Sequence, residues 1–571
     1  MTEETKSKQI DILIVGGGPV GLFAANLAVK SGLTTRIVDI EAEPQHWGRG
    51  DWLHGRTLEI LDYTGLNTDL LGTGSKVETL AVHHQLPPRN QTATAGRTSI
   101  DFVPESIVTK YKHLLCVGQH ITESNFQHTL SENGIQIERP VTVTQFTREE
   151  GEDYPILATL ENKKSHSTEM VRAKYLLGCD GAHSSIRKQI GIEYEGHGSK
   201  QNCGVLDALV QTNFPDRKSI SFVRGPFGSH ACLFPRENNL TRVMVELPSD
   251  ERDKNQIPLE TVQSEARRAL LPHRVEFLAV MWWTVYSVGQ HVANRYTDKK
   301  EDDDDNIIPR VFLCGDACHS QSPTLGQGLN TGIGDVFNLM WKIAMVNAGL
   351  AKSSLLSTYE TERRPVAQKV IAIDRLVSGN DLKDEPLMSL IQENQKFTTG
   401  FGISYATAGT SPLSLRVGDR APDFKVVAYN TGKKARLYEL WHTKNSWCFH
   451  LLILAGDLTH TTERVTQALE TFKDKKWSWL QIHLITTTTQ RGVIDSLPST
   501  TINKQALLID KINQAQCHHG YNVKDTNAPA AVIVRPDLHI GWIGMLSASM
   551  EDWLANEINL DFKGWNVLEA E

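Results

Sequence analysis

The apolar and polar positions near the N-terminus predict the start of a Rossmann-like α/β fold. Asp11–Val15 is a short, mostly apolar run with β-branched residues, which is typical of a buried strand. Glycines follow it, and Gly21–Ser31 then has helical character. Thr35–Asp39 has the pattern of a second strand. This order of strand, glycine turn, helix and strand is typical of a βαβ unit.

The same stretch contains the only candidate for a membrane span that the pattern offers. Ile12–Val29 carries no charge and is long enough to cross a bilayer. However, the segment Gly16–Pro19 lies early in it and would break a single helix. We therefore expect a strand, a tight turn and a helix here, and no membrane partner.

The middle of the chain has the pattern of an antiparallel sheet. Apolar and polar residues alternate from about Cys203 to Glu246 among many turn residues, and Val275–Val288 has the same character. An acidic run closing with Asp302–Asp305 is interpreted as a solvated loop before a further apolar strand, Val311–Cys314.

The last third of the chain predicts two helices and a second unit. Gly334–Gly349 and Thr358–Leu376 have helical patterns. Residues 398–414 are rich in Gly, Ser and Thr, which is typical of a linker. A separate C-terminal domain of residues 415–571 is expected after this linker.

Composition and charge narrow the class of protein. The 571 residues are enough for about three domains. With 59 basic and 67 acidic side chains the formal net charge is −8, so no general attraction to nucleic acid is expected. The eight cysteines form no CxxC pair and no secretory signal precedes the first strand, which favours reduced thiols and a cytoplasmic location.

A glycine motif between the first strand and the first helix predicts a dinucleotide site. In G-x-G-x-x-G, Gly16 permits the tight turn, Gly18 lets a pyrophosphate approach the backbone, and Gly21 lets helix and strand pack closely. Asp39 ends the next strand, where a carboxylate can bind a ribose hydroxyl. The helix N-terminus offers free N–H groups to the phosphates. The motif alone does not separate NAD from FAD.

Two later segments favour FAD. Leu176–Arg187 contains an Asp-Gly turn at Asp180 after an apolar strand, and Val311–Asn330 contains a Gly-Asp turn at Asp316 after another. An acid at a strand end can bind the ribityl hydroxyls of FAD. The glycines before the following helix let main-chain N–H groups reach the electron-rich edge of a flavin, and the helix N-terminus would stabilise its anionic reduced form.

These motifs together resemble the group A flavoprotein aromatic hydroxylases, which share the para-hydroxybenzoate hydroxylase fold. The resemblance covers about residues 8–395 and is closest in pattern to the phenol 2-monooxygenases. Three further segments carry it: Asp51–Glu59, Pro235–Arg242 and Trp282–Gln290.

The resemblance implies a fold and a reaction. The implied parts are an FAD-binding domain of residues 1–76, 113–200 and 300–397, a substrate-binding β-sheet domain of residues 77–112 and 201–299, a linker of residues 398–414, and a thioredoxin-like domain of residues 415–571. FAD is held non-covalently, NADH or NADPH reduces it without a second Rossmann fold, and dioxygen then forms a flavin hydroperoxide that hydroxylates a phenol. The hydroperoxide needs a dry pocket, and the phenol reacts best as phenolate.

The resemblance also implies catalytic and substrate-pocket residues. Asp51 is the candidate base, although it could instead cap the helix after it. Arg242 is a candidate fixed cation that favours phenolate, and its alternative is a surface ion pair. Tyr286 could contact a substrate hydroxyl or be a plain core residue, and Trp282 is placed in the pocket. Met244 stands where the relative has Tyr, which makes the wall more apolar and favours a substrate bulkier than phenol.

The expected cofactor-binding residues come from the motifs and from the family pattern. They are Gly16, Gly18, Gly21, Asp39, Arg49, Gln119, Asp180, Asp316, Pro323, Gly328, Leu329 and Asn330. Arg49 and Gln119 could instead be a solvated loop residue and a helix cap. His319 is expected to be a structural hydrogen bonder. No cluster with metal-ligand spacing is recognised, so no metal is expected.

The tail resembles a redox fold without redox residues. Val417–Phe424 is similar to the opening of thioredoxin-like and peroxiredoxin-like domains, and Val534–Asp537 to their late strand turn. Neither Cys448 nor Cys517 has a partner in CxxC spacing, so thiol catalysis is not expected. We expect a structural role for this domain, or one in supporting a homodimer.

The function implied is an FAD-dependent monooxygenase that uses NAD(P)H and dioxygen to hydroxylate a phenolic or polyketide-like aromatic. Two alternatives remain open. The same flavin chemistry could give Baeyer–Villiger insertion, epoxidation or oxidative decarboxylation, because pocket charge decides how the peroxide reacts. The chain could also be a flavin-binding protein without catalysis.

Overall fold

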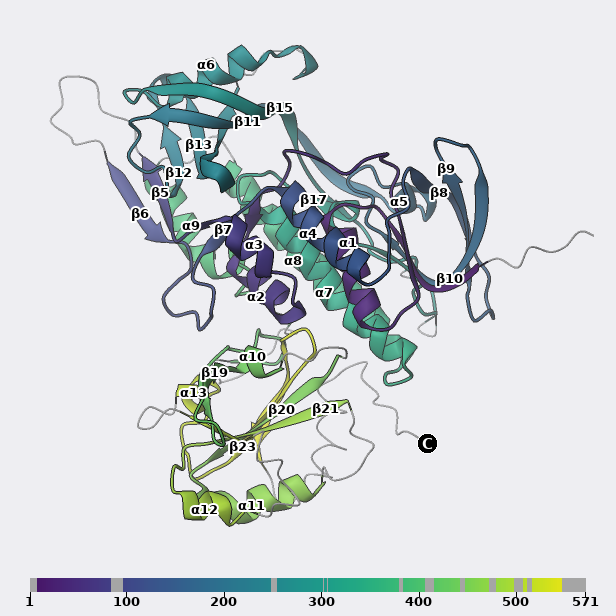
Figure 1. Cartoon of the computed structure of the whole chain (residues 1–571), viewed down its shortest axis with the longest axis vertical. Coiled ribbons are helices and arrows are strands. Elements are labelled where there is room, and N and C mark those ends of the chain that lie inside the picture. The colour runs from purple at the N-terminus through teal and green to yellow at the C-terminus, as the bar shows by residue number, and fades with distance from the viewer. Residues whose placement is uncertain are drawn as a thin grey trace, which may run out of the picture.

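The computed structural model shows a large N-terminal part and a smaller C-terminal domain beside it (Figure 1). The structure describes residues 8–83, 96–247, 254–300, 302–304, 307–378, 384–405, 415–441, 447–471, 479–497, 507–510 and 516–546. Asp305, the second half of the predicted linker and the last residues of the chain lie outside these ranges.

The first sheet contains the predicted βαβ unit. Its order is β2-β1-β10-β9-β8, and β16 also pairs with β10, off this linear order. Strands β2, β1, β10 and β16 are parallel, whereas β8 and β9 are antiparallel to their neighbours. The strands are β1 (Lys8–Val15), β2 (Thr35–Val38), β8 (Val141–Arg148), β9 (Ile156–Asn162), β10 (Thr168–Gly178) and β16 (Val311–Leu313).

The predicted turn and helix after the first strand are confirmed. Strand β1 ends at Val15 and helix α1 (Pro19–Lys30) begins after the glycine turn, so Ile12–Val29 is not one helix. Proline at the start of α1 is well tolerated because its missing N–H would have no partner inside the helix. Among the residues that the structure describes, no helix combines the length and the apolar character needed to cross a bilayer.

The predicted antiparallel sheet forms a second, eight-stranded layer. Its order is β17-β15-β11-β14-β13-β12-β5-β6, antiparallel except for the pair β12–β5. Helix α6 (Leu259–Ala269) packs on it. The strands are β5 (Thr79–His83), β6 (Arg97–Asp101), β11 (Tyr194–Thr212), β12 (Ile220–Arg224), β13 (His230–Pro235), β14 (Thr241–Glu246), β15 (Val275–Ala293) and β17 (His319–Ser320).

Two of these strands join the sheet to the first part of the fold. Strands β11 and β15 have 19 residues each and pair along almost their whole length. Since β11 begins at Tyr194, the domain boundary predicted at residues 200 and 201 lies inside a strand. Pairing with β15 resumes at Asn202 after an irregularity that follows Gly198, so β11 runs past that position.

Helix α7 (Gln327–Asn347) begins earlier than the predicted Gly334–Gly349. Glycines weaken a helical pattern, which hides the first two turns of α7 in the sequence. The structure needs these glycines for close packing, because a Cβ on Gly332 would press on Val20 of α1. Helix α8 (Thr358–Ser378) begins at the predicted residue.

Short elements complete the N-terminal part. A small sheet has the order β3-β7-β4. The elements are β3 (Trp52–Leu53), β4 (Ser75–Val77), β7 (Leu114–Cys116), α2 (Gly55–Thr64), α3 (Thr68–Thr73), α4 (Gln119–Glu132), α5 (Ser185–Gln189) and α9 (Asp384–Thr398).

The C-terminal domain has its own seven-stranded mixed sheet, in the order β19-β18-β22-β21-β20-β23-β24. Strands β20, β21 and β22 are parallel in the middle of it. Its thioredoxin-like character stays a prediction. The elements are β18 (Lys425–Ala428), β19 (Lys434–Arg436), α10 (Leu437–Trp441), β20 (Phe449–Gly456), α11 (Leu458–Thr471), β21 (Leu480–Thr486), α12 (Arg491–Asp495), β22 (Leu507–Ile509), α13 (Gln516–Gly520), β23 (Ala530–Val534) and β24 (Ile540–Met545).

The two parts share buried surface. Trp341 of α7 is fully buried and packs edge-on against Phe449 of β20 at 5.9 Å between ring centroids. The described half of the predicted linker is also packed, since Phe401 is buried and Tyr405 N–H donates to the Gly418 carbonyl at 2.9 Å. This stretch therefore differs from a free linker.

Candidate functional site

A cavity of about 840 Å³ opens at the carboxyl ends of the parallel strands. Val15, Cys179 and Cys314, which end or follow β1, β10 and β16, all line it. This is the place where parallel α/β sheets usually bind ligands, and the volume suits a large one. Every site residue predicted from sequence lines the cavity except Gly21 and Asn330.

The three motif glycines occupy the positions that the motif predicts. Gly16 has φ +112°, and a Cβ there would overlap the Cys179 carbonyl. A Cβ on Gly21 would overlap the Gly16 carbonyl oxygen, so Gly21 serves helix–strand packing. Gly18 is different, because a Cβ there would meet no atom of the described residues within 4 Å, its chain neighbours aside. The open space in front of Gly18 and the N-terminus of α1 form a cradle for an anionic group.

The two acidic turns lie side by side at the cavity. Asp180 Oδ2 accepts from Ser185 N–H at 2.7 Å, while its Oδ1 has no hydrogen-bond partner in the described part of the chain. Asp316 is exposed toward the cavity, yet the surrounding protein buries it enough to raise its pKa. Arg187 ties the turns together by donating to the Ala317 and Ala182 carbonyls, both at 2.8 Å.

The start of α7 is bonded to the strand that follows Asp51. Gly326 has φ +60° and lies so close to the Trp52 ring that a Cβ would overlap it. Asn330 does not line the cavity. Its amide donates to the Trp52 carbonyl at 2.9 Å, and its Oδ1 accepts from His54 N–H at 2.9 Å and Thr57 Oγ1 at 2.6 Å. Asn330 therefore holds the two walls together.

The end of the cavity near Asp39 is polar. Arg139, which also lines the cavity, donates to Asp39 Oδ2 at 3.2 Å. Gln119 accepts from Gly50 N–H at 3.0 Å and donates to Glu123 at 2.7 Å, so it braces the loop before Asp51. These contacts leave the Asp39 carboxylate close to the glycine turn, where a ribose could reach it.

At the other end of the cavity, Asp51 belongs to a buried cluster of charged groups. Arg242 makes a bidentate pair with Asp207, with both N–O distances at 2.7 Å. Arg236 forms a second pair with Glu237, at 2.8 and 3.0 Å. Asp51 Oδ2 lies 3.3 Å from Arg242 and 3.5 Å from Arg236. Three acids therefore share two guanidinium groups.

Asp51 is the acid of this cluster that favours a proton. Burial raises its pKa; Arg242 and Arg236 oppose this rise. The negative charges of Asp207 and Glu237 raise the pKa of Asp51 further. Both carboxyls carry these charges because their arginine partners hold their own pKa values low despite burial. With both arginines already paired, Asp51 carries the excess charge of the cluster and can take up and release a proton.

The wall beyond the cluster is mostly apolar. Met244 is buried in the apolar cluster against which Trp282 packs, and the Arg242 guanidinium lies 5.4 Å from the Trp282 ring centroid. The Tyr286 hydroxyl lies near the Cys203 thiol and has no oxygen or nitrogen partner within the described ranges. Burial raises the pKa of Tyr286, so its hydroxyl keeps its proton and can donate.

His319 has the structural place that the sequence predicts. Its Nε2 lies 2.7 Å from Asp335 Oδ2, which also accepts from Gly315 N–H at 3.1 Å. Cys318 completes a buried trio with the spacing of a metal site. However, Arg363 donates to Asp335 Oδ1 at 2.8 Å, and this guanidinium supplies the positive charge that a metal would bring.

Sequence reasoning missed four charged residues of the site. They are Asp207, Arg236 and Glu237 in the buried cluster and Arg139 beside Asp39. Arg236 and Glu237 stand inside the family segment Pro235–Arg242, which was a signal for them. Asp207 has no motif and is revealed only by its pairing with β14.

Known proteins are similar in sequence to most of this chain. The family model described as "FAD binding domain" matches residues 9–374. Phenol 2-monooxygenase of Aspergillus fumigatus is 30% identical over 500 residues, which cover 84% of this chain and 80% of that protein. The 3-hydroxybenzoate 4-monooxygenase of Comamonas testosteroni is 32% identical over 491 residues, covering 80% of this chain and 76% of that protein.

A solved structure shows the same fold over the whole chain. Aklavinone-11 hydroxylase, solved as a ternary complex with FAD and aklavinone, superposes with a TM-score of 0.72. The superposition covers 98% of this chain and 99% of the hydroxylase chain at 19% sequence identity. The likeness is therefore one of fold.

Two alanine variants separate the roles of the motif glycines. We expect Gly18→Ala to fold with little change in melting temperature and to raise the dissociation constant for FAD by about tenfold or more, because the new methyl enters the cradle. Gly16→Ala should instead lower the melting temperature of the FAD-free protein, because its Cβ overlaps a backbone carbonyl. Fluorescence titration with FAD and thermal denaturation measure both. Unchanged FAD affinity in Gly18→Ala would contradict the cradle.

The raised pKa of Asp51 has a consequence for stability. The folded protein binds this proton more tightly than the unfolded chain, so the contribution of Asp51 is fully present below the unfolded pKa of about 4. It is lost as the pH rises through the folded pKa. Wild type should therefore lose melting temperature relative to Asp51→Asn as the pH rises from 4. Asp216, whose pKa Arg97 lowers, contributes stability that is lost only as the pH falls below the unfolded pKa, so wild type should keep its melting temperature relative to Asp216→Asn over the same range. Equal slopes for the two variants would refute the assignment.

Proposed function

Because this chain belongs to the FAD-dependent aromatic hydroxylase family, we propose that it is a monooxygenase that uses NAD(P)H and dioxygen to hydroxylate a phenolic or polyketide-like aromatic. The observation that carries the proposal is the joining of two features in one cavity. The glycine cradle lies at one end, and the buried cluster around Asp51 lies at the other.

The residues present fit FAD. Gly18 and the N-terminus of α1 would hold the pyrophosphate, Asp39 the ribose, and Asp180 and Asp316 the ribityl hydroxyls. Gly328 and Leu329 at the start of α7 would offer backbone N–H groups to the flavin ring. When bound, FAD supplies the redox chemistry, by accepting hydride from NAD(P)H and activating dioxygen so that one oxygen atom goes to the substrate.

The chain itself supplies the acid–base part of the reaction. A phenol between the cluster and the α7 end of the cavity would lose its hydroxyl proton to the Asp51 carboxylate. Arg242, fixed by Asp207, would stabilise the resulting phenolate, which is richer in electrons at the ring carbons. The Tyr286 hydroxyl, which keeps its proton, would donate to the substrate oxygen or to a second polar group of the substrate.

The apolar wall supports a substrate larger than phenol. Met244 and the Trp282 ring exclude water from the reacting end, which any oxygen transfer there requires. Methionine is also adaptable in shape, so the wall can accommodate a fused or substituted ring. The two relatives are named for phenol and for 3-hydroxybenzoate, and both compounds carry a phenolic hydroxyl. This common feature agrees with a phenolic substrate.

The proposal is tested by a substrate-dependent turnover assay. The FAD-loaded protein, given NADH or NADPH in air, should oxidise it faster when a phenolic or polyketide-like aromatic is present, and the product should gain one oxygen on a ring carbon. Mass spectrometry with isotopically labelled dioxygen identifies that oxygen, and NMR locates it. An inserted ring oxygen, a lost carboxyl carbon or an unchanged aromatic would each refute hydroxylation.

Replacing the base separates proton transfer from flavin reduction. We expect Asp51→Asn to keep its FAD and its rate of reduction by NAD(P)H, but to lower the rate of oxygen transfer by about 10²-fold, which is typical for a lost general base. Stopped-flow absorption follows the two half-reactions separately. Asp216→Asn, the same substitution in the loop between β11 and β12 and outside the cavity lining, should leave both rates unchanged. Equal oxygen transfer in Asp51→Asn and wild type would remove Asp51 from the mechanism.

A further inference from the structure

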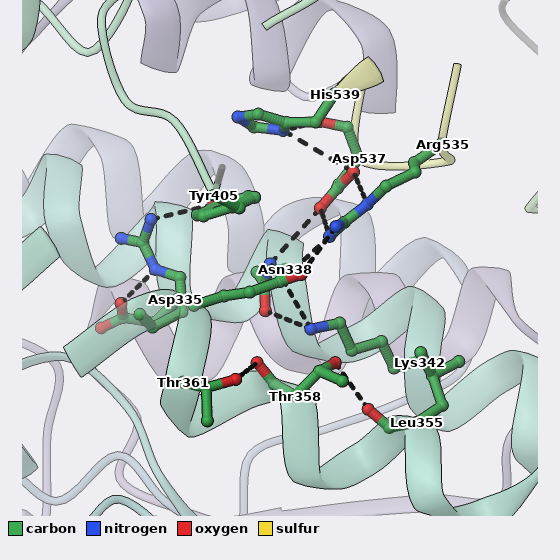
Figure 2. Close-up of polar contacts among 12 residues, drawn as sticks. Asp335, Asn338, Lys342, Leu355, Thr358, Thr361, Tyr405, Arg535, Asp537 and His539 are labelled. Carbon is green, nitrogen blue, oxygen red and sulfur yellow. Dashed lines mark hydrogen bonds and ion pairs between the residues drawn. The ribbon is translucent and has the colours of Figure 1, made fainter. Parts of the chain in front are cut away.

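A hairpin turn of the C-terminal domain reaches into the N-terminal part. It joins β23 to β24 and is closed by a hydrogen bond from Arg535 N–H to the His539 carbonyl at 2.7 Å. Figure 2 shows Arg535 and Asp537 pointing from this turn toward Asn338 and Lys342 on α7. All four side chains are buried.

The turn is bound to α7 and α8 by a network of balanced charges. Arg535 donates to both carboxylate oxygens of Glu362, at 2.6 and 2.9 Å, and to Asp537 at 2.6 Å. Lys342 donates to Glu362 at 2.8 Å and to Asn338 at 2.9 Å. Burial alone would raise the pKa of Glu362, but the positive charges of Arg535 and Lys342 lower this pKa to about 2. Two cations and two anions therefore neutralise one another.

From this network a chain of contacts leads to the flavin end of the cavity. The His539 ring lies 4.4 Å from the Tyr405 ring, and the Tyr405 hydroxyl accepts from Arg363 at 3.0 Å. Arg363 donates in turn to Asp335, which accepts from the Gly315 N–H at 3.1 Å. Gly315 immediately precedes Asp316, so the end of this chain of contacts fixes the acidic turn.

A second set of contacts leads to the Asp51 end. The Asp537 carbonyl accepts from Arg56 at 3.0 Å, and Arg56 pairs with Glu59 at 3.1 Å. Arg420 of the C-terminal domain also donates to Glu59, at 2.8 Å. Arg56 and Glu59 lie on α2, which follows Asp51 and β3 directly.

The charges at this interface do more than hold it together. Buried ion pairs contribute little net stability compared with apolar packing of the same volume, because desolvation offsets their attraction. Apolar packing between Trp341 and Phe449 already joins the two parts. What directional charge pairs add is a single fixed arrangement of the elements that bear them.

We propose that the turn Arg535–His539 is a positioning element for the oxygen-transfer site, acting through Tyr405 and Arg363 on the Gly315–Asp316 turn. The C-terminal domain thus takes part in the reaction without touching substrate or cofactor. Tyr405 is the residue of this chain of contacts that can be tested with the smallest substitution. Tyr405→Phe removes one hydroxyl and leaves the ring packing intact. This inference rests on the proposed function, since it requires FAD beside Asp316.

The test compares Tyr405→Phe with Tyr521→Phe. The Tyr521 hydroxyl is also held by one hydrogen bond, to the Pro422 carbonyl at 3.0 Å, but that bond lies wholly within the C-terminal domain. Both variants should lose a similar amount of melting temperature. Only Tyr405→Phe should raise the FAD dissociation constant, by about three- to tenfold for the net worth of one ordinary hydrogen bond, and shift the visible absorption of the bound flavin.

A double-mutant cycle on the FAD dissociation constant shows whether the effect passes through Arg363. In an Arg363→Lys background, Tyr405→Phe should have no further effect, because the hydroxyl acts only through the guanidinium. If Tyr405→Phe matches Tyr521→Phe in FAD affinity and spectrum, or if its effect adds fully to Arg363→Lys, the positioning role is overturned. Failure of the wild type to bind FAD overturns the proposed function as well, so the two failures are distinguished by the wild-type titration.

Discussion

The parallel pairing of β1, β10 and β16 is the constraint on which the whole site depends. Main-chain hydrogen bonds continue past the strand ends, from Cys179 N–H to the Val15 carbonyl at 2.8 Å and from Cys314 N–H to the Gly178 carbonyl at 3.0 Å. These bonds place the glycine turn, the Asp180 turn and the Asp316 turn at one edge of the sheet, although more than a hundred residues separate each from the next. The cavity follows from that edge.

The second wall depends on a different sheet and on buried charge. Strand β14 carries Arg242 and pairs with β11, which carries Asp207 directly opposite it. The fixed guanidinium can then face Asp51, which arrives from the loop before β3. Since three acids surround two arginines, one acid carries the excess negative charge, and burial raises the pKa of Asp51. The C-terminal domain bears on both walls, through α2 and through α7 and α8.

Local patterns predict local structure well here, and contacts between distant segments poorly. The strand Asp11–Val15, the turn at Gly16 and the antiparallel sheet after Cys203 follow from periodicity and glycine chemistry, and the structure confirms them. The first turns of α7 could not be predicted, because Gly328 and Gly332 lower helix propensity there and Gly332 is needed for close packing against Val20. Asp207 and the Arg535 turn could not be predicted either, since their partners are set by tertiary packing that no short motif encodes. The candidate site residues come from the motifs and the family segments, and most of them line the cavity.

The central claim is that one cavity brings a flavin and a phenol together beside Asp51. The most direct measurement is the visible absorption spectrum of the FAD-free protein, titrated first with FAD and then, without oxygen, with a series of phenolic and polyketide-like aromatics. The account predicts saturation at one FAD per chain, followed by a saturable change in the flavin bands when an aromatic binds. FAD binding without any perturbation by such aromatics, or no FAD binding at all, would contradict it.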